Sequence, residues 1–302
     1  MSRKYGQALY LIIDEYDSFT NIVFSEQVEE TYFKTSLIGR FYSHVFKLFK
    51  GMFERIFLTG VSPVTLDDLT SGFNIGWNIS MAPELDKMLG FSTEDVRQMF
   101  TYFKEAGQLP ADCDIEAMIA EMKPWYDNYC FAKECLESDV RVFNCDMVLY
   151  YLRNYISYKH SPEIMLDPNT KTDYKKLNML IQLDKLDGDR KGVMMEIIEK
   201  GEIAATLIPS FSANEMTDPE TFPSLLFYYG MLTIKGKYGS MLSLGIPNNN
   251  VRMQYYNYIL KQYAQYKIVN VNKLQIAFVK MSLDGLWQEP LQYMADCYKQ
   301  LS

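Results

Sequence analysis

The most constraining feature of this sequence is an apolar run that ends in acids close to the first methionine. In "LYLIIDEYDSF" the run Leu9–Ile13 stops at Asp14, Glu15 and Asp17. A short run that is apolar on both faces is typical of a central strand in a parallel sheet, because both faces of such a sheet are covered. We therefore predict a strand over 8–13 that presents carboxylates at the end of a parallel sheet.

A second apolar run lies at a distance that suits a neighbouring strand. "RIFLTGVSP" covers 55–63, and residues 36–53 between the two runs carry apolar groups at helical spacing. Strand, crossover helix and strand make a βαβ unit, whose strands are parallel and lie in one sheet. The first 65 residues are therefore predicted to belong to an α/β sheet, with 8–13 and 55–60 as neighbouring strands.

Acids at the end of such a strand form the Walker B pattern of nucleoside triphosphatases. There the sheet places one carboxylate where it holds Mg²⁺ and the next where it polarises the attacking water. Asp14 is therefore the candidate metal ligand and Glu15 the candidate general base. Thr59, at the end of the neighbouring strand, stands where such enzymes place a sensor of the γ-phosphate. Two plainer interpretations stay open: buried strands often end on acids, and Thr59 could hydrogen-bond its own turn.

Downstream, the periodicity changes from strand to helix. Ser92 or Thr93 is the expected cap of a helix over 92–103. Further helices are predicted over 114–122, 145–158, 172–181, 190–200, 249–264 and 272–301. Residues 222–248 indicate a helix, a strand, a Gly-Lys-Tyr-Gly turn and a second strand, which together suggest a winged-helix element.

Composition narrows the class of protein. Of the 302 residues 48% are hydrophobic and 23% charged, as in soluble globular proteins, and no apolar stretch reaches the roughly 20 residues that cross a bilayer. The net charge of -8 argues against a broad phosphate-binding surface. The five cysteines and two histidines lack the paired spacing of a zinc site, and the N-terminus does not resemble a signal peptide. We therefore expect free thiols in the cytoplasm.

Five motifs, in chain order, resemble those of the AAA-ATPase-like family, P-loop proteins common in Bacteroidetes. They are "LIIDEYDSF", "IFLTGVSPVTLDDLTSGFN", "LGFSTEDVRQMF", "WYDNYCF...VFNCDMVLYYL" and "LLFYYGMLTI...LGIPNNNVRMQYY". The resemblance implies ATP and Mg²⁺ as cofactors and a PD-(D/E)xK nuclease-like domain at the C-terminal end of the family's proteins.

The resemblance also implies a fold that is α/β plus mainly helical. Residues 1–85 would be the C-terminal part of a partial P-loop NTPase sheet of the ASCE type, and 86–205 a helical lid. Residues 206–265 would form a winged-helix-like domain, and 266–302 a helical linker towards the nuclease-like domain.

Three further groups of residues each admit two interpretations. Trp125–Asp127 could line the nucleotide side of the lid or form its core. Arg141 could reach a γ-phosphate or be solvated. Lys235, Lys237 and Arg252, around the wing, could contact a nucleic-acid backbone or be solvated.

One element of such an ATPase is missing from the sequence. The phosphate-binding loop G-x-x-x-x-G-K-[ST] opens a helix, whereas the one Gly-Lys pair of this chain, at Gly236, is followed by Tyr238 and has Met231 in place of the first glycine. We therefore expect a truncated member of the family that does not hydrolyse ATP alone and that self-associates through an uncovered flank of its sheet. The alternative is a non-enzymatic module that binds a partner protein or a nucleic acid through the lid and winged-helix regions.

Overall fold

The computed structural model describes residues 9–17, 44, 48, 52–61, 63, 77–138, 141–167, 189–211, 215, 218–265 and 269–301. The chain forms two compact units, Met1–Asn250 and Val251–Ser302. Within the described ranges, no helix is both long and apolar enough to span a bilayer.

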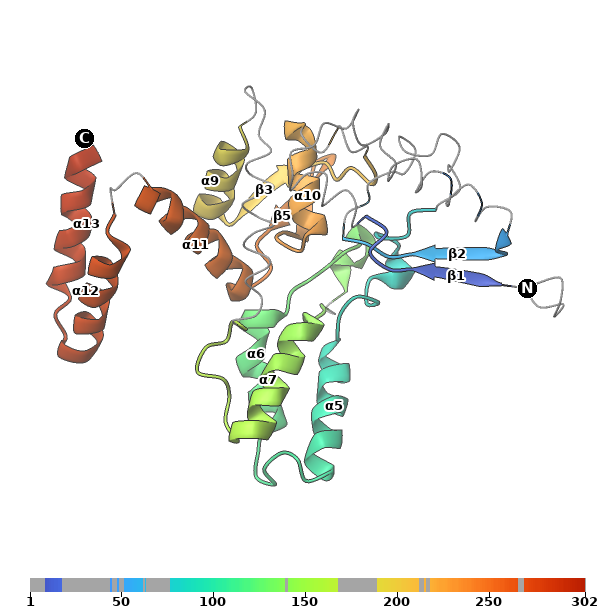
Figure 1. Cartoon of the computed structure of the whole chain (residues 1–302), viewed down its shortest axis with the longest axis horizontal. Coiled ribbons are helices and arrows are strands. Elements are labelled where there is room, and N and C mark those ends of the chain that lie inside the picture. Colours follow the sequence, from blue (N-terminus) through green and yellow to red (C-terminus); the bar gives the residue numbers. More distant parts are fainter. Residues whose placement is uncertain are drawn as a thin grey trace. The chain divides into compact units, whose positions relative to one another are not determined.

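The N-terminal element is a two-stranded parallel sheet (Figure 1). β1 (Tyr10–Ile13) and β2 (Arg55–Leu58) pair residue for residue, first with first and last with last. The prediction that these two runs are neighbouring strands is confirmed. The helix predicted over 36–53 lies outside the described residues except at four positions: 44, 48 and 52 are helical, and 53 is not.

One face of this sheet is open. Tyr10 and Ile12 are 62% and 73% exposed, and Phe57, which pairs with Ile12, is 38% exposed. The alternate residues, such as Leu11 and Ile13, are half-buried. A sequence pattern typical of a strand covered on both faces thus occurs in a strand with one uncovered face, that of Tyr10 and Ile12.

Three helices form the best-packed part of the molecule. α5 (Thr93–Glu105), α6 (Ile115–Tyr126) and α7 (Cys145–Tyr158) lie side by side and enclose one apolar core. Its fully buried members, all with no exposed surface, are Val96, Phe100, Met122, Tyr126, Phe143, Val148 and Tyr151. The helices predicted over 92–103, 114–122 and 145–158 are confirmed.

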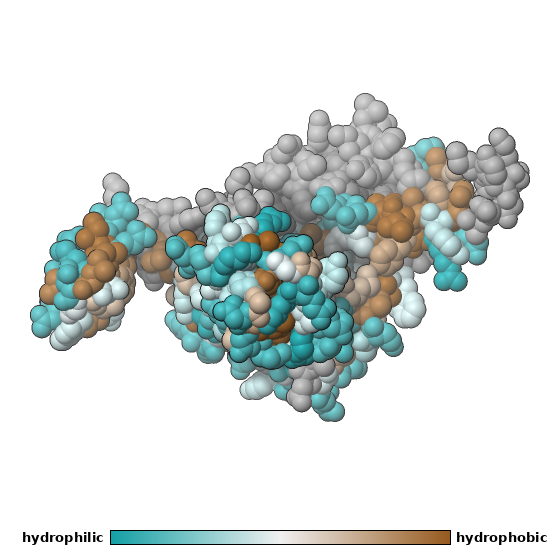
Figure 2. Space-filling model, turned by 90° about the horizontal axis from the view of Figure 1, so that it is seen from below, coloured by the Kyte–Doolittle hydropathy of each residue, from teal (hydrophilic) through white to brown (hydrophobic). Residues whose placement is uncertain are grey.

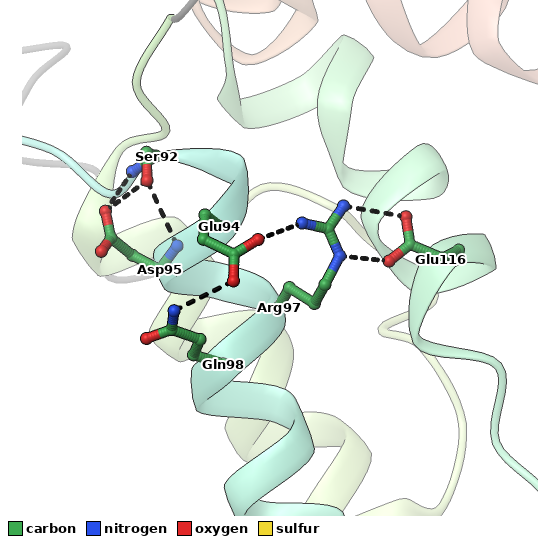
Figure 3. Close-up of polar contacts among 6 residues, drawn as sticks. All are labelled: Ser92, Glu94, Asp95, Arg97, Gln98 and Glu116. Carbon is green, nitrogen blue, oxygen red and sulfur yellow. Dashed lines mark hydrogen bonds and ion pairs between the residues drawn. The ribbon is translucent and has the colours of Figure 1, made fainter.

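Polar contacts set the start of α5 and join it to α6 (Figure 3). The Ser92 side chain accepts the N–H of Asp95 at 3.2 Å, and Asp95 accepts the N–H of Ser92 at 2.8 Å, so the predicted cap at Ser92 is confirmed. Arg97 lies between Glu94 on its own helix and Glu116 on α6. Its hydrogen bonds hold the pKa of Glu116 below the ordinary value. All three charged groups are exposed, so the join contributes little stability.

A three-stranded antiparallel sheet follows. α9 (Arg190–Lys200) leads into β3 (Glu202–Ala205), and α10 (Phe222–Tyr228) precedes the hairpin of β4 (Thr233–Tyr238) and β5 (Met241–Gly245). The strand order is β3-β5-β4. The helix, strand, turn and strand predicted over 222–248 are therefore present, whereas β3 was not predicted. Because β3 pairs with β5, the sheet spans the boundary proposed between the lid and the winged-helix-like domain. The lid and residues 206–250 lie in the unit Met1–Asn250, and residues 251–265 lie in the other unit.

Helices make up the rest of the chain. α11 (Asn249–Gln265) precedes α12 (Val271–Asp284) and α13 (Gln288–Leu301), which pack on each other as a hairpin. The single helical stretch predicted over 272–301 is in fact two helices. Gly285 ends α12 in the left-handed conformation, with φ of 70°, which glycine adopts without steric cost.

Candidate functional site

The predicted site residues meet where β1 and β2 end. The Thr59 hydroxyl donates to Asp14 Oδ1 at 2.6 Å, and the Thr59 N–H donates to the Ile13 carbonyl at 2.8 Å. Asp14 Oδ1 also accepts the N–H of Glu15 at 3.0 Å. The structure thus brings Asp14, Glu15 and Thr59 together. The hydroxyl of Thr59 bonds across to the other strand and not within its own turn.

The Asp14 carboxylate suits a magnesium ligand. The side chain is exposed, and its second oxygen, Oδ2, accepts no hydrogen bond within the described part of the chain. The same part of the chain holds no group of three or more potential metal-ligating side chains. That is compatible with Mg²⁺, which is commonly bound by one or two carboxylates together with substrate phosphates and waters. The Asp14 side chain is therefore compatible with binding Mg²⁺ through Oδ2.

Glu15 has an unusual backbone conformation. Its φ is 52°, in the left-handed region that residues with a Cβ seldom adopt. Its side chain is exposed. Such a conformation costs on the order of 1–3 kcal/mol and persists only where the surroundings impose it. The turn after β1 therefore holds a carboxylate at the sheet end against its local preference.

Asp17 and Gly60 lie in close contact within this turn. Asp17 is 1% exposed, and both of its carboxylate oxygens accept the N–H of Val61 at 3.2 Å. A Cβ on Gly60 would lie 2.5 Å from Asp17 Oδ1 and 2.7 Å from the ring of Tyr16. Gly60 was not predicted as part of the site. Its position directly after Thr59 is the only sequence signal that marks it.

The turn also bonds directly to the end of β2. The Tyr16 N–H donates to the Thr59 carbonyl at 3.0 Å. Burial, followed by the charge of Asp17 and the hydroxyl of Tyr228 on α10, raises the pKa of the Tyr16 phenol. Tyr16 therefore stays neutral at physiological pH. The residues at the sheet end are thus held by hydrogen bonds and by the half-buried ring of Tyr16.

The lid candidates have structural roles. The Tyr126 hydroxyl donates to the Met165 carbonyl at 2.6 Å inside the helical core, and Trp125 packs against that core. Arg141 is half-buried and donates to the Ser138 and Leu136 carbonyls at 2.6 and 3.2 Å, next to the 3₁₀ turn Lys133–Glu137. The interpretation of Arg141 as a solvated side chain is therefore wrong.

Asp127 is a buried carboxylate of this region. It is 6% exposed at the end of α6, and its Oδ1 has no hydrogen-bond partner among the described residues. Burial raises the pKa of this carboxyl, although Lys123, Arg141 and Lys235 act in the opposite direction. The sequence placed Asp127 beside two aromatic residues but contained no signal that its carboxylate would be buried.

The wing lysines are exposed. Lys235 and Lys237 lie on β4, and Tyr238 beside them is 67% exposed. Arg252 lies on α11 in the second compact unit. Lys237 and Tyr238 lie next to the β4–β5 turn, whereas Lys235 lies towards the start of β4, close to Gly245.

Comparison with known proteins assigns the N-terminal segment. Searches against curated proteins and against solved structures gave no match. The family described as predicted AAA-ATPase matches residues 1–70, the segment that contains β1, β2, Asp14, Glu15 and Thr59. Over these 70 residues the chain is similar to the family of predicted AAA-ATPases.

Proposed function

We propose that the ends of β1 and β2 form the magnesium and water side of an ATP-hydrolysing site, a Walker B element. The observation that carries the proposal is the 2.6 Å hydrogen bond from Thr59 to Asp14 across two parallel strand ends. This bond brings the Asp14 carboxylate and the Thr59 hydroxyl together at one exposed point of the sheet. The family match over residues 1–70 supports the same assignment.

Each residue has a distinct role. Asp14 would bind Mg²⁺ through Oδ2 while the Thr59 hydroxyl fixes the orientation of Oδ1. Glu15, exposed one residue on, would accept the proton of the attacking water. Mg²⁺ bound with ATP would neutralise charge on the phosphates. Asp17 would hold the turn in place through the N–H of Val61.

These residues alone do not provide the groups that bind a triphosphate. The loop amides and lysine that do so in P-loop enzymes are absent from the 302 residues, because no G-x-x-x-x-G-K-[ST] motif occurs in them. Positioning and charge neutralisation by that loop supply most of the rate in phosphoryl transfer. The 302 residues are therefore proposed to be inactive alone. The five free thiols suit the reducing cytoplasm, where such a site would meet ATP.

Two measurements test this proposal. Phosphate release by the chain should not exceed background, and Glu15→Gln should leave it unchanged. Mn²⁺ added with ATP, as a paramagnetic substitute for Mg²⁺, should broaden the amide signals of Asp14 and Thr59 in the NMR spectrum, and Asp14→Asn should abolish that broadening.

The matched control is Glu54→Gln. Glu54 is an exposed acid at the opposite end of β2, so its loss should leave the broadening intact. Broadening that survives Asp14→Asn would remove the metal assignment. Turnover that Glu15→Gln abolishes would instead show that another segment of this chain grips the phosphates.

A second candidate function is binding of a nucleic acid through the winged-helix-like region. The observation that favours it is the order α9-β3-α10-β4-β5 with the sheet order β3-β5-β4, which we interpret as a winged-helix topology. α10, however, cannot enter a DNA groove, because every side chain from Phe222 to Phe227 is buried. Contact would therefore fall to the exposed side chains of Lys235, Lys237 and Tyr238 on β4.

Charge reversal tests the second candidate. Lys235→Glu with Lys237→Glu should weaken binding to duplex DNA about tenfold or more at low salt and reduce the salt dependence by about two phosphate contacts. Reversal of two exposed lysines elsewhere, Lys87 and Lys191, is the control with the same change in net charge. Equal losses in the two double variants would mean that only net charge matters, and the wing would not be a binding site.

A further inference from the structure

α12 carries apolar side chains on two nearly opposite faces. Leu274 and Ala277 lie on the side that packs against α13, where Ala277 is 6% exposed. Ile276, Val279 and Leu283, spaced three and four residues apart, share the other face and are 58%, 55% and 78% exposed. A helix that is apolar on both sides is typical of a position between two layers. Only one of these layers, α13, is part of the hairpin.

α13 and the turn before it extend this surface. Leu291, Met294 and Tyr298 recur at the same spacing and are 53%, 42% and 74% exposed, and Trp287 in the turn is 58% exposed. Figure 2 shows hydrophobic residues in brown running over this hairpin, at the left of the view. Exposed apolar side chains therefore occur on both helices and on the turn between them.

The hairpin has almost no core of its own. Within 269–299, whose side chains the structure describes, Ala277 and Pro290 alone are buried. A chain shorter than roughly 40 residues usually needs disulfides, metals or association to fold stably. The hairpin, with two helices of 14 residues each, is below that size. Cys297, the cysteine in the hairpin, is a free thiol. Association would add apolar burial to the unit Val251–Ser302, which contains this hairpin.

Size and charge fit a second copy as the partner. Ten large apolar side chains of the hairpin are more than a third exposed. At roughly 50–100 Å² each they offer about 500–1,000 Å², against about 800 Å² per partner in stable interfaces. The hairpin balances Lys273, Lys280 and Lys299 with Asp284, Glu289 and Asp296, so no net charge repels an identical surface. Two-fold dimers are also the commonest oligomers.

We propose that the α12–α13 hairpin is a homodimer interface, in which the outer face of α12 and the stripe on α13 pack against the same surfaces of a second copy. Four helices then enclose Ile276, Val279, Leu283 and Leu291 in one core, as in a four-helix bundle. The dimer is independent of the nucleotide site proposed above.

Sedimentation of the full chain over about a hundredfold range of concentration tests the dimer. The wild-type chain should change from monomer to dimer as concentration rises. Leu283→Glu should weaken dimerisation about a hundredfold or more, because a two-fold interface contains the substitution twice and each copy buries an unpaired charge. Tyr298→Glu on α13 should act in the same direction. Both residues are mostly exposed in the monomer, so both variants should keep the wild-type far-ultraviolet circular dichroism.

Two controls separate this surface from others. Gln292→Glu adds the same charge on the polar face of α13, where Gln292 lies beside Asp296, and should leave the dimer intact. Ile12→Glu places the charge on the open face of β1, which is the competing apolar surface. A chain that stays monomeric at every concentration would overturn the proposal. So would a dimer that persists in Leu283→Glu or that Ile12→Glu dissociates.

Discussion

The three-helix region and the strand ends are held together by different forces. The apolar core enclosed by α5, α6 and α7 contains seven side chains with no exposed surface. The ion pairs of Arg97 lie outside this core, at the helix surface. Around β1 and β2 the one fully buried described side chain is a carboxylate, that of Asp17, while Ile12 faces solvent. Apolar burial stabilises the first region, and hydrogen bonds stabilise the second.

The difference matters for function. Apolar packing is non-directional and tolerates rearrangement, whereas hydrogen bonds fix orientation. The residues proposed to act on Mg²⁺ and water lie in the region where orientation is fixed by Thr59 and Asp17. The helical region supplies stability and carries no candidate catalytic group. Its polar outlier, Asp127, is buried without a full set of partners.

The same substitution in the two regions should give the largest contrast. Phe100 has no exposed surface and stacks on Tyr151 at 6.2 Å, so Phe100→Ala should lower the free energy of unfolding by about 3–5 kcal/mol. Phe57→Ala, at a side chain that is 38% exposed on the open sheet face, should cost less than about 1 kcal/mol. Urea unfolding monitored by circular dichroism measures both losses. Equal losses would contradict the proposed difference between the two regions.

Loss of the Asp17 carboxylate should have the next largest effect. Asp17→Ala leaves the half-buried N–H of Val61 without its carboxylate acceptor and should cost about 1–3 kcal/mol. Asp17→Asn keeps one oxygen acceptor and should recover part of that loss. Amide hydrogen exchange at Val61 should accelerate in the order wild type, Asn, Ala. An unchanged exchange rate in Asp17→Ala would show that other contacts hold this turn.

A methyl group at Gly60 tests how tightly the turn is built. Gly60→Ala would place its Cβ 2.5 Å from Asp17 Oδ1, so the turn must move, at a cost of about 1–3 kcal/mol. Gly236→Ala is the matched control, because there the nearest atom lies at 3.9 Å. Thermal unfolding of the two variants should separate them. A Gly60→Ala protein as stable as Gly236→Ala would mean that the turn is loosely packed.

The effect of Asp127 should be the smallest and should depend on pH. Its pKa is raised by burial, so the folded chain holds this proton more tightly than the unfolded chain does. The resulting stability is present below about pH 4 and is lost as pH rises through the raised pKa. Asp127→Asn should therefore be more stable than wild type near pH 7, on the order of 1 kcal/mol, and equal to it in acid. A stability difference between Asp127→Asn and wild type that grows as the pH falls would contradict this prediction.

The parts that sequence predicted well depend on local signals. Ser92 and Asp95 form a capping box within four residues, and the apolar spacing of α7 predicted its limits to the residue. β1 and β2 were recognisable because each is a short apolar run, and the helical stretch between them favoured a parallel pair. In each case the residues that decide the structure lie close together in the chain.

The parts that sequence missed depend on distant partners. β3 has four residues of weak strand character and exists because it pairs with β5, some forty residues on. Arg141 was interpreted through charge alone, yet its guanidinium bonds to carbonyl groups of a neighbouring turn. The need for glycine at position 60 arises from the side chains of Tyr16 and Asp17, which fold across it. None of these contacts leaves a periodic pattern.

At position 15, local stability and the proposed activity favour different residues, because the backbone there is left-handed. In a mutant library scored for protein abundance, glycine and asparagine at position 15 should outcompete glutamate, because both tolerate a φ of 52°. A library scored for ATP turnover, in a protein that also carries the phosphate-binding loop, should reverse that ranking. The two enrichment profiles should diverge at this position more than at Asp17, where stability and function favour the same residue.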